Sequence, residues 1–292
     1  MENSRYPYSP ISDRQQMKWP DGARIALWVC PNIECFHIDK PLSRESSHLP
    51  DVHGYSLRDY GARVGVFRIM NVLDKYSIRA SSFLNADVCE RYPAIIEEGK
   101  KRRWEWLGHG TTNHLRMHDY PNDGEKEMIR QVRETMTAAI GEAPKGWASP
   151  GLAETFYSPD HLAAEGFEYV ADWGCDDQPV PMQVRQGRMI IVPVHASLSD
   201  IVIFLRGDHT PEDYFRMVCD QFDTLYEEGA QSGRVMALPL HPFIVGLPFR
   251  IKYLDKVLEH ICAHEGVWLA TGGEIASWYF EHYYQGAKKR CD

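Results

Sequence analysis

The sequence predicts an α/β protein built as a single parallel barrel. Short apolar runs alternate with helical patterns about seven times along the chain, and such a repeat of strand then helix is typical of parallel sheets. The chain has 292 residues, which suits one barrel, and its composition does not change abruptly along its length. We therefore expect one barrel domain over 23–292. A polar, proline-containing arm over 1–22 should lie on the surface or on a neighbouring subunit.

The individual elements follow from the spacing of apolar residues. The run over 24–31 is almost entirely apolar, which is typical of a strand covered on both faces. The predicted strands are 24–31, 79–84, 104–109, 145–149, 168–174, 189–194, 235–240 and 267–270. Apolar residues three and four positions apart indicate the helices. The predicted helices cover 66–73, 87–99, 124–140, 158–165, 211–228, 251–261 and the residues after 273, while the polar segment 37–58 is expected to be a functional loop.

Composition and charge exclude several classes of partner. The formal net charge is −9, which argues against nucleic acid or an anionic membrane as the main partner. The first residues lack a basic-then-apolar leader, and no stretch is apolar for long enough to span a bilayer, so a cytoplasmic protein is expected. The seven cysteines are widely spaced without a Cys-x-x-Cys pair, and we expect free thiols rather than disulfides.

Polar residues directly after the predicted strands are the candidates for function, because barrel enzymes place their chemistry at the carboxyl ends of the strands. Glu34 follows the first strand and could act as a general base or bind a metal. His241 ends a strand before a proline and could donate a proton to a leaving nitrogen. The other polar residues at strand ends are Asn32, His109, Ser149, Asp172, Asp176 and Asp177.

His109 lies between two glycines, which allow a ligand to approach the backbone closely. Two histidines that share a metal from one turn are usually four positions apart, but His114 is five positions away and Asn113 occupies the expected place. His109 is therefore interpreted as an acid–base or substrate-binding residue, and His114 as a loop residue bonded to backbone. A zinc site of Cys35, His109 and His114 would require a bulged loop.

The segment 172–179 reads Asp-Trp-Gly-Cys-Asp-Asp-Gln-Pro and is dense in carboxylates. Neighbouring carboxylates in a cleft raise each other's pKa, and an arginine nearby lowers it again. We expect Asp172, Trp173, Asp176 and Asp177 to bind substrate, although a solvated loop explains the composition equally well. The arginines that could pair with the carboxylates are Arg63, Arg68, Arg116 and Arg206.

Taken together, these motifs resemble the polysaccharide (chitooligosaccharide) deacetylase superfamily over about 24–280. They are Glu34 after the first strand, His-Gly at 109–110, Ser-Pro-Gly at 149–151 and Leu-His-Pro at 240–242. The run Arg-Asp-Tyr-Gly-Ala-Arg-Val-Gly at 58–65, with the segment 172–179, is similar to the branch that contains metal-independent allantoinase and the cyclic imide hydrolases. The resemblance implies a distorted (β/α)7-type barrel.

The resemblance also implies that this chain departs from the superfamily at the metal site. The deacetylases carry a Thr-Phe-Asp-Asp strand end, whose first Asp is the base and whose second Asp is a ligand. Positions 32–35 read Asn-Ile-Glu-Cys here, so Glu34 keeps the base while Cys35 replaces the ligand. His109 matches the first metal histidine, Asn113 falls on the second, and His241 matches the leaving-group histidine. The arginine of the superfamily's Arg-x-Pro motif is absent from 148–151. With two of three ligands lost, no metal cofactor is expected, and a single zinc is the alternative.

The predicted function is hydrolysis of a C–N bond in a small cyclic amide or imide without a metal. Imide carbonyls are electrophilic and their nitrogen leaves as a stabilised anion, so less Lewis-acid help is required. Glu34, or His109 held by it, would deprotonate water, and His241 would protonate the leaving nitrogen. Backbone N–H groups and one cationic side chain would hold the oxyanion. Further candidates for substrate contact are Ser149, Arg63 and Cys35.

Two other functions stay open at this point. A metal-dependent deacetylase acting on an N-acetylated sugar would need zinc and an open, aromatic-lined groove. A non-catalytic barrel would bind a small ligand or act as a scaffold. We expect a small cyclic amide as the partner, with no nucleic acid and no membrane. The arm and the aromatic C-terminal segment 278–284 favour a homo-oligomer, either a dimer or a tetramer.

Overall fold

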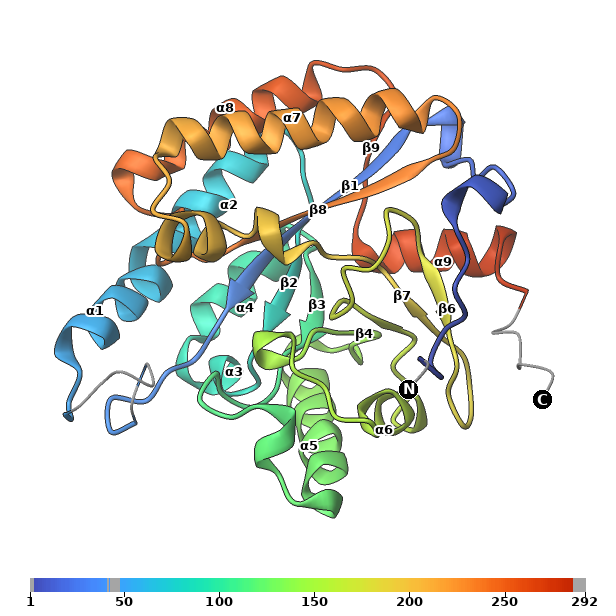
Figure 1. Ribbon diagram of the computed structural model, residues 1–292. Helices are drawn as coiled ribbons and strands as arrows, with labels where there is room; N and C mark the ends of the chain where they lie inside the picture. The colour runs from blue at the N-terminus through green and yellow to red at the C-terminus, as the bar shows by residue number, and fades with distance from the viewer. Residues whose placement is uncertain (1–2, 41, 43–47, 286–292) are drawn as a thin grey trace.

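One curled sheet carries the fold in the computed structural model, which describes residues 3–40, 42 and 48–285. Within these residues the strands are β1 (Ile25–Ile33), β2 (Ser81–Leu84), β3 (Glu105–Gly108), β4 (Gly146–Trp147), β5 (Tyr169–Val170), β6 (Val180–Met182), β7 (Met189–Ile191), β8 (Arg234–Leu240) and β9 (Val267–Leu269). They run in the order β6-β7-β5-β4-β3-β2-β1-β8, and β9 pairs with the first half of β1. The sheet is parallel except for the β6–β7 pair and curls into a distorted half-barrel (Figure 1). The predicted fold class is confirmed.

Helices cover the outside of the sheet and α9 lies against its inner side (Figure 1). Their bounds are α1 (Val52–Tyr60), α2 (Val66–Lys75), α3 (Asp87–Arg91), α4 (Pro93–Lys101), α5 (Asn122–Ile140), α6 (Ser158–Ala164), α7 (Pro211–Gly229), α8 (Pro248–Cys262) and α9 (Gly272–His282). None of the described helices is both long and apolar enough to cross a bilayer. The six cysteines among the described residues are free, while Cys291 lies outside them.

Strand β1 shows why an almost continuous apolar run is needed at the centre of the sheet. Ile25, Leu27 and Val29 pack into the larger core between the sheet and the outer helices. The alternating residues Ala26, Trp28 and Cys30 pack into a second core inside the curl. Successive side chains of a strand point to opposite faces, so a strand covered on both sides must be apolar at every position.

The structure differs from the predicted elements at three places. The helix expected over 87–99 is broken at Pro93 into α3 and α4, because a proline cannot continue the hydrogen-bond ladder of a preceding helix. The segment 37–58 contains the start of α1 in place of a loop throughout, although residues 41 and 43–47 lie outside the described part. Strand β6 was not predicted, because its three residues include Pro181 at the sheet edge.

The N-terminal arm lies on the surface of the barrel, which is one of the two positions predicted for it. Arg5 forms an ion pair with Asp160 at 3.0 Å, and Arg14 pairs with Asp176 at 2.5 Å. Trp19 is buried and donates from its indole nitrogen to the carbonyl of Arg234 at 2.8 Å. Met17 and Trp19 of the arm belong to the second core.

Candidate active site

Three predicted residues meet at the carboxyl ends of β1, β3 and β8. The Oε1 atom of Glu34 lies 3.8 Å from Nε2 of His109 and 4.0 Å from Nε2 of His241. All three side chains are almost fully buried, with 8%, 3% and 8% of their surface exposed. Adjacent parallel strands end at one edge of the sheet, which is why residues so distant in sequence come together.

Asp200 holds the imidazole of His241 from the side opposite Glu34. Nδ1 of His241 lies 2.6 Å from Oδ1 of Asp200, and the backbone N–H of His241 donates to Oδ2 at 2.7 Å. Asp200 is fully buried. Burial alone would lower the pKa of His241, but the carboxylates of Asp200 and Glu34 outweigh burial and raise it. His241 therefore retains its proton to a higher pH than a free histidine.

His109 is oriented by a carbonyl and presents its other nitrogen to the site. Its Nδ1 donates to the carbonyl oxygen of Ala148 at 2.6 Å, and a neutral imidazole then carries a lone pair on Nε2. That Nε2 is buried without a hydrogen-bond partner among the described residues. A buried nitrogen without a partner, aimed at Glu34, marks a position where a water molecule or a substrate atom would be bound.

Glu34 is surrounded by groups that favour its ionised form. The amide nitrogen of Asn113 donates to Oε1 at 2.7 Å. Burial raises the pKa of Glu34, but the neighbouring imidazole of His109 and the charges of His241 and Arg58 outweigh burial and lower it. Glu34 is therefore a carboxylate throughout the neutral range.

Arg58 of α1 supplies a positive charge beside the three residues. Its guanidinium lies over the rings of Phe36 and Phe243, with centroid distances of 4.7 and 5.1 Å. Burial lowers the pKa of Arg58, and Glu34 partly opposes this effect. The guanidinium donates to the carbonyl of Gly54 at 3.0 Å, whereas its buried Nε has no hydrogen-bond partner in the described part of the chain.

Two glycines bring Arg58 and His241 close together. Gly61 and Gly65 form a π-helical turn between α1 and α2, and this turn packs against the loop that follows β8. A Cβ atom on Gly61 would lie 2.7 Å from the backbone nitrogen of Phe243, and one on Gly65 would lie 2.0 Å from the carbonyl oxygen of Pro242. Only glycine allows this approach, which explains the glycine spacing in the 58–65 motif.

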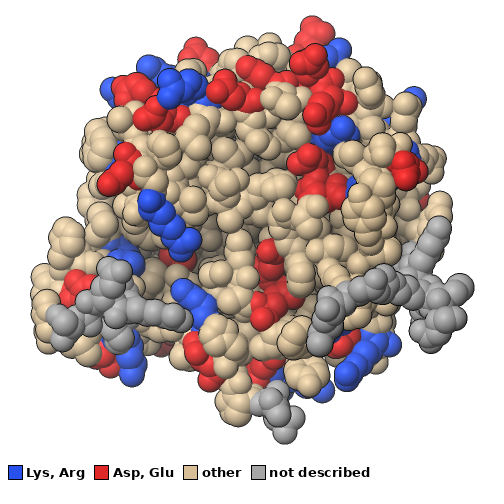
Figure 2. All heavy atoms as spheres, viewed as in Figure 1, with Lys and Arg blue, Asp and Glu red and all other residues tan. Residues whose placement is uncertain are grey.

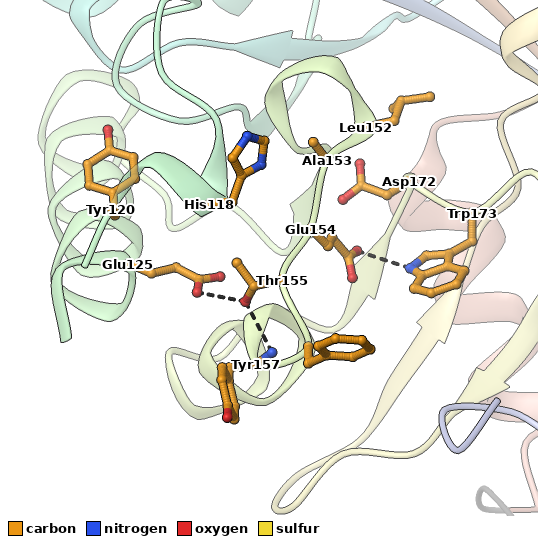
Figure 3. A pocket seen from close by; sticks show the side chains of 11 residues that line it. His118, Tyr120, Glu125, Leu152, Ala153, Glu154, Thr155, Tyr157, Asp172 and Trp173 are labelled. Atoms are coloured by element: carbon orange, nitrogen blue, oxygen red, sulfur yellow. Dashed lines mark hydrogen bonds between the residues drawn. The ribbon is translucent and has the colours of Figure 1, made fainter. Parts of the chain in front are cut away.

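A cavity of about 600 Å³ opens beside the strand ends of β4 and β5 (Figure 3). Asp172 and Glu154 point into it, and Trp173 forms part of its wall. The indole nitrogen of Trp173 donates to Oε1 of Glu154 at 3.1 Å, and the backbone N–H of Ser149 donates to Oδ1 of Asp172 at 2.6 Å. The second carboxyl oxygens, Oε2 of Glu154 and Oδ2 of Asp172, are inaccessible and have no hydrogen-bond partner among the described residues.

The two carboxyl groups of the cavity share one proton. Burial, followed by the charge of Asp172, raises the pKa of Glu154 to about 10, and burial also raises the pKa of Asp172. Two carboxylates this close cannot both ionise. Glu154 is therefore protonated at neutral pH, which makes its carboxyl group a possible hydrogen-bond donor.

Ser149 and Cys35 lie at the site but are engaged elsewhere. The hydroxyl of Ser149 accepts from the indole nitrogen of Trp147 at 3.0 Å, so only its backbone serves the cavity, by positioning Asp172. Cys35 is fully buried, and its Sγ lies 3.6 Å from a guanidinium nitrogen of Arg91. Neither side chain faces the space between Glu34 and His109.

Three residues expected to contact substrate lie away from the site. Arg63 is exposed on the outer surface and pairs with Asp59 at 2.5 Å. The carbonyl of Asp177 accepts from the N–H of Val235 at the beginning of β8, whereas His241 follows the end of that strand. At 3.3 Å per residue the two lie roughly 20 Å apart. Asp176, the neighbour of Asp177, pairs with Arg14 of the arm rather than with any predicted arginine.

The donors that meet here do not fit a zinc ion. Zinc takes at least three protein ligands with nitrogen, sulfur or oxygen atoms. Asn113 turns its amide N–H to Glu34, and Cys35 faces Arg91, so of the implied ligand positions 35, 109 and 113 only His109 presents a donor beside the base Glu34. The alternative set of Cys35, His109 and His114 does not form either, because Nε2 of His114 accepts from the backbone N–H of His37 at 2.6 Å.

Asp200, Arg58 and Glu154 were missed as functional residues by sequence reasoning. Arg58 is the first residue of the 58–65 motif, and Asp200 lies in the segment 196–210 that connects two elements beside the pocket. A buried aspartate beside a strand-end histidine follows a common pattern, because a histidine that works as an acid needs a partner for Nδ1. Glu154 gave no signal, since it follows a short β4 of two residues.

Comparison with known proteins relates this geometry to one family. Residues 55–170 match the profile of the family described as Polysaccharide deacetylase. A Schizosaccharomyces pombe protein named "Putative polysaccharide deacetylase" is 26% identical over 254 residues, which cover 78% of this chain and 76% of that protein. The Peptidoglycan deacetylase of Helicobacter pylori is 24% identical over 250 residues, covering 74% of this chain and 84% of that protein.

Solved structures agree with the fold. The crystal structure of Puue Allantoinase superposes with a TM-score of 0.86 at 27% identity and covers 96% of this chain and 99% of that one. A probable polysaccharide deacetylase from Pseudomonas aeruginosa PAO1 superposes with a TM-score of 0.85 at 24% identity, covering 96% of this chain and 100% of that one. Both matches cover nearly the whole length of this chain.

Proposed function

Because the chain belongs to the polysaccharide deacetylase superfamily, whose hydrolases act on C–N bonds, we propose that it opens the ring of a small cyclic amide or imide without a metal. One observation carries the proposal. The position of a second metal histidine is taken by Asn113, whose amide donates to the base Glu34 at 2.7 Å. Likeness to Puue Allantoinase over nearly the full length of both chains supports the same substrate class.

The first step is attack of water on a ring carbonyl. Oε1 of Glu34 and Nε2 of His109 are both acceptors and lie 3.8 Å apart, a distance that lets one water donate to both. Glu34 takes the proton as the water oxygen bonds to the carbonyl carbon. The Arg58 guanidinium, desolvated beside Glu34, is the cation that balances the charge of the resulting oxyanion.

The second step breaks the C–N bond. His241 holds a proton on Nε2 because Asp200 and Glu34 raise its pKa. It gives that proton to the departing nitrogen while the carbonyl re-forms, and the product carries a carboxylate and an amide or amine. The proton accepted by Glu34 returns to solvent or to His241 for the next cycle.

The cavity lined by Glu154, Asp172 and Trp173 suits a small planar ring with N–H and C=O groups, although Glu34, His109 and His241 are not among its lining residues. Its volume of about 600 Å³ lies within the usual range of small-molecule pockets. The carboxyl groups of Asp172 and Glu154 would bind ring N–H and C=O groups once Oδ2 and Oε2, which are buried in this structure, turn toward the ring, and Trp173 would pack on the ring face. His109 links the reacting residues to the cavity. Its Nδ1 donates to the carbonyl of Ala148, and the next residue, Ser149, donates its backbone N–H to Asp172.

Replacing Asp172 by Asn should raise KM about tenfold with little change in kcat, since it removes an acceptor used in binding rather than in the transition state. Glu154→Gln is the matched control, because an uncharged Glu154 already resembles an amide, and its KM should change less than threefold. The two variants are compared by steady-state kinetics, with unfolding midpoints recorded for both. Equal effects of the two substitutions would contradict the assignment of charge and proton.

A substrate panel with and without chelator tests the proposed function. Succinimide, phthalimide, dihydrouracil, allantoin and an N-acetylglucosamine oligomer would each be incubated with the full chain, with metal content measured on the same samples. We expect ring opening of at least one cyclic amide, at a rate that does not change when chelator removes bound metal. Loss of activity on chelation and recovery with zinc would overturn metal independence.

The names of the curated relatives favour a second candidate, an N-deacetylase acting on an acetylated sugar polymer. That reaction shares the base and the leaving-group acid but has a less activated carbonyl. Acetate release from the oligomer, without turnover of any cyclic amide, would favour this candidate. No turnover of either class would favour a ligand-binding barrel.

A further inference from the structure

We propose a zinc site on the outer surface, where α7 and α8 pack together. Its ligands are Asp223 of α7 and His260 and His264 of α8, whose ligand-type atoms lie within 4.8 Å of one another. Histidines four positions apart lie on one face of a helix and can bind the same ion. The spacing that is missing between His109 and His114 therefore occurs elsewhere in the chain.

The hydrogen bonds of the cluster orient it for metal binding. Nδ1 of His264 donates to the carbonyl of His260 at 2.9 Å, so Nε2 of a neutral His264 carries the lone pair. Histidines that bind metals usually donate their other N–H to a carbonyl or a carboxylate in this way. Nε2 of His260 lies 2.7 Å from Oδ1 of Asp223. Ligand atoms around a tetrahedral zinc are about 3.3 Å apart, so the His260 and Asp223 atoms would separate from 2.7 Å, while atoms that lie up to 4.8 Å apart would approach one another.

Aromatic side chains hold the two imidazoles in place. The ring of Phe222 lies 5.0 Å from that of His264 and 5.8 Å from that of His260, measured between centroids. Tyr226 lies 5.1 Å from His264. Ligands whose rotamers are already restricted by packing lose less entropy when they bind an ion.

The charge along α7 favours a cation, whereas α8 carries Lys252 and Lys256 before His260. Along α7 the acidic residues far outnumber the single arginine, Arg216, and they are Glu212, Asp213, Asp220, Asp223, Glu227 and Glu228. Figure 2 shows acidic side chains along the edge formed by α7 and α8, with basic side chains among them. By contrast, the other described group with metal-ligand atoms in range, Cys35, His37 and Asp87, has the Arg91 guanidinium 3.6 Å from its thiol. That cation would repel a second one.

The zinc site would fasten α7 to α8 at the end far from the reaction. His260 lies twelve residues after Pro248, the first residue of α8, and this corresponds to about 18 Å along the helix. The N-terminal end of α8 follows the loop that carries His241. Zinc should therefore stabilise the fold without taking part in hydrolysis.

Equilibrium dialysis against zinc, followed by metal analysis, tests the proposal on the chelator-treated full chain. We expect one zinc to be lost in His264→Gln, and the affinity to fall at least tenfold in Asp223→Asn. Zinc should raise the unfolding midpoint of the unsubstituted protein but not that of His264→Gln. His282→Gln is the matched control, because His282 makes the same Nδ1 bond to the carbonyl four residues earlier, at 2.9 Å.

The outcomes separate this site from the reaction and from the other cluster. Zinc binding that is unchanged in His264→Gln and Asp223→Asn overturns the proposal, and so does binding that is lost in Cys35→Ser instead. Hydrolysis should be the same in His264→Gln as in the unsubstituted protein. If the active site depended on a metal, chelation would abolish hydrolysis, but His264→Gln would still lower the zinc content. The two proposals can therefore fail independently.

Discussion

Replacing Glu34 by Gln is expected to lower kcat/KM for the cyclic amide by roughly 10²–10⁴-fold, the usual contribution of a general base. Glutamine keeps the size of the side chain and can still contact Asn113, but it cannot accept a proton from water. The pKa of Glu34 is lowered by His109, His241 and Arg58 despite its burial, so the carboxylate is ready at neutral pH. Steady-state kinetics on the best substrate of the panel measures the effect.

Asp59→Asn is the matched control for Glu34→Gln, because it makes the same change from carboxylate to amide on the outer surface, where Asp59 pairs with Arg63. It should leave kcat/KM within about twofold, as surface substitutions usually do. If Glu34→Gln retained more than a tenth of the activity, the base would have to be sought in another group, and His109 would be the first candidate.

Replacing Asp200 by Asn is expected to move the alkaline limit of the kcat profile to lower pH. Burial lowers the pKa of His241 and the negative charges of Asp200 and Glu34 raise it, with a net rise. The protonated acid is present below this pKa and is lost as the pH increases through it. Removing the negative charge of Asp200 lowers the pKa of His241, because burial then has less electrostatic opposition. His241 therefore loses its proton at a lower pH. At neutral pH kcat should fall about 10–100-fold.

The pH profile separates a positioning role of Asp200 from a purely structural one. A variant that is only less stable would lose activity at every pH with the same limits. His241→Ala provides the second comparison, because it should abolish the alkaline limit altogether and affect substrates with a poor leaving nitrogen most. An alkaline limit that stays in place in Asp200→Asn would show that His241 is not the acid.

Much of the fold could be predicted from the pattern of apolar residues. Strand β1 is covered on both faces, and its almost continuous run of apolar residues predicts this directly. The rule that chemistry lies at the carboxyl ends of parallel strands then selects Glu34, His109 and His241, and the structure brings these three together. Strand β6 escaped prediction because it is short and contains a proline.

The same rule misplaced Asp176 and Asp177. They follow a strand in sequence, but the carbonyl of Asp177 accepts from the N–H of Val235 at the beginning of β8. The carboxylate of Asp176 forms an ion pair with Arg14 of the arm. A position after a strand end in sequence therefore predicts proximity to the site only for the first few residues that follow the strand. The path of the loop decides the rest.

The sequence by itself determined the fold class and the edge of the sheet at which Glu34, His109 and His241 meet. These are properties of periodicity and residue type, which are local. The loss of metal ligands at positions 35 and 113 stays a prediction that the family resemblance implies. The tertiary structure alone decided which charges surround the three central residues: Arg58 beside Glu34, Asp200 on His241, and the shared proton of Glu154 and Asp172. A pKa depends on burial and on charges within a few ångströms, and these come from segments whose distance in sequence does not reveal their contact.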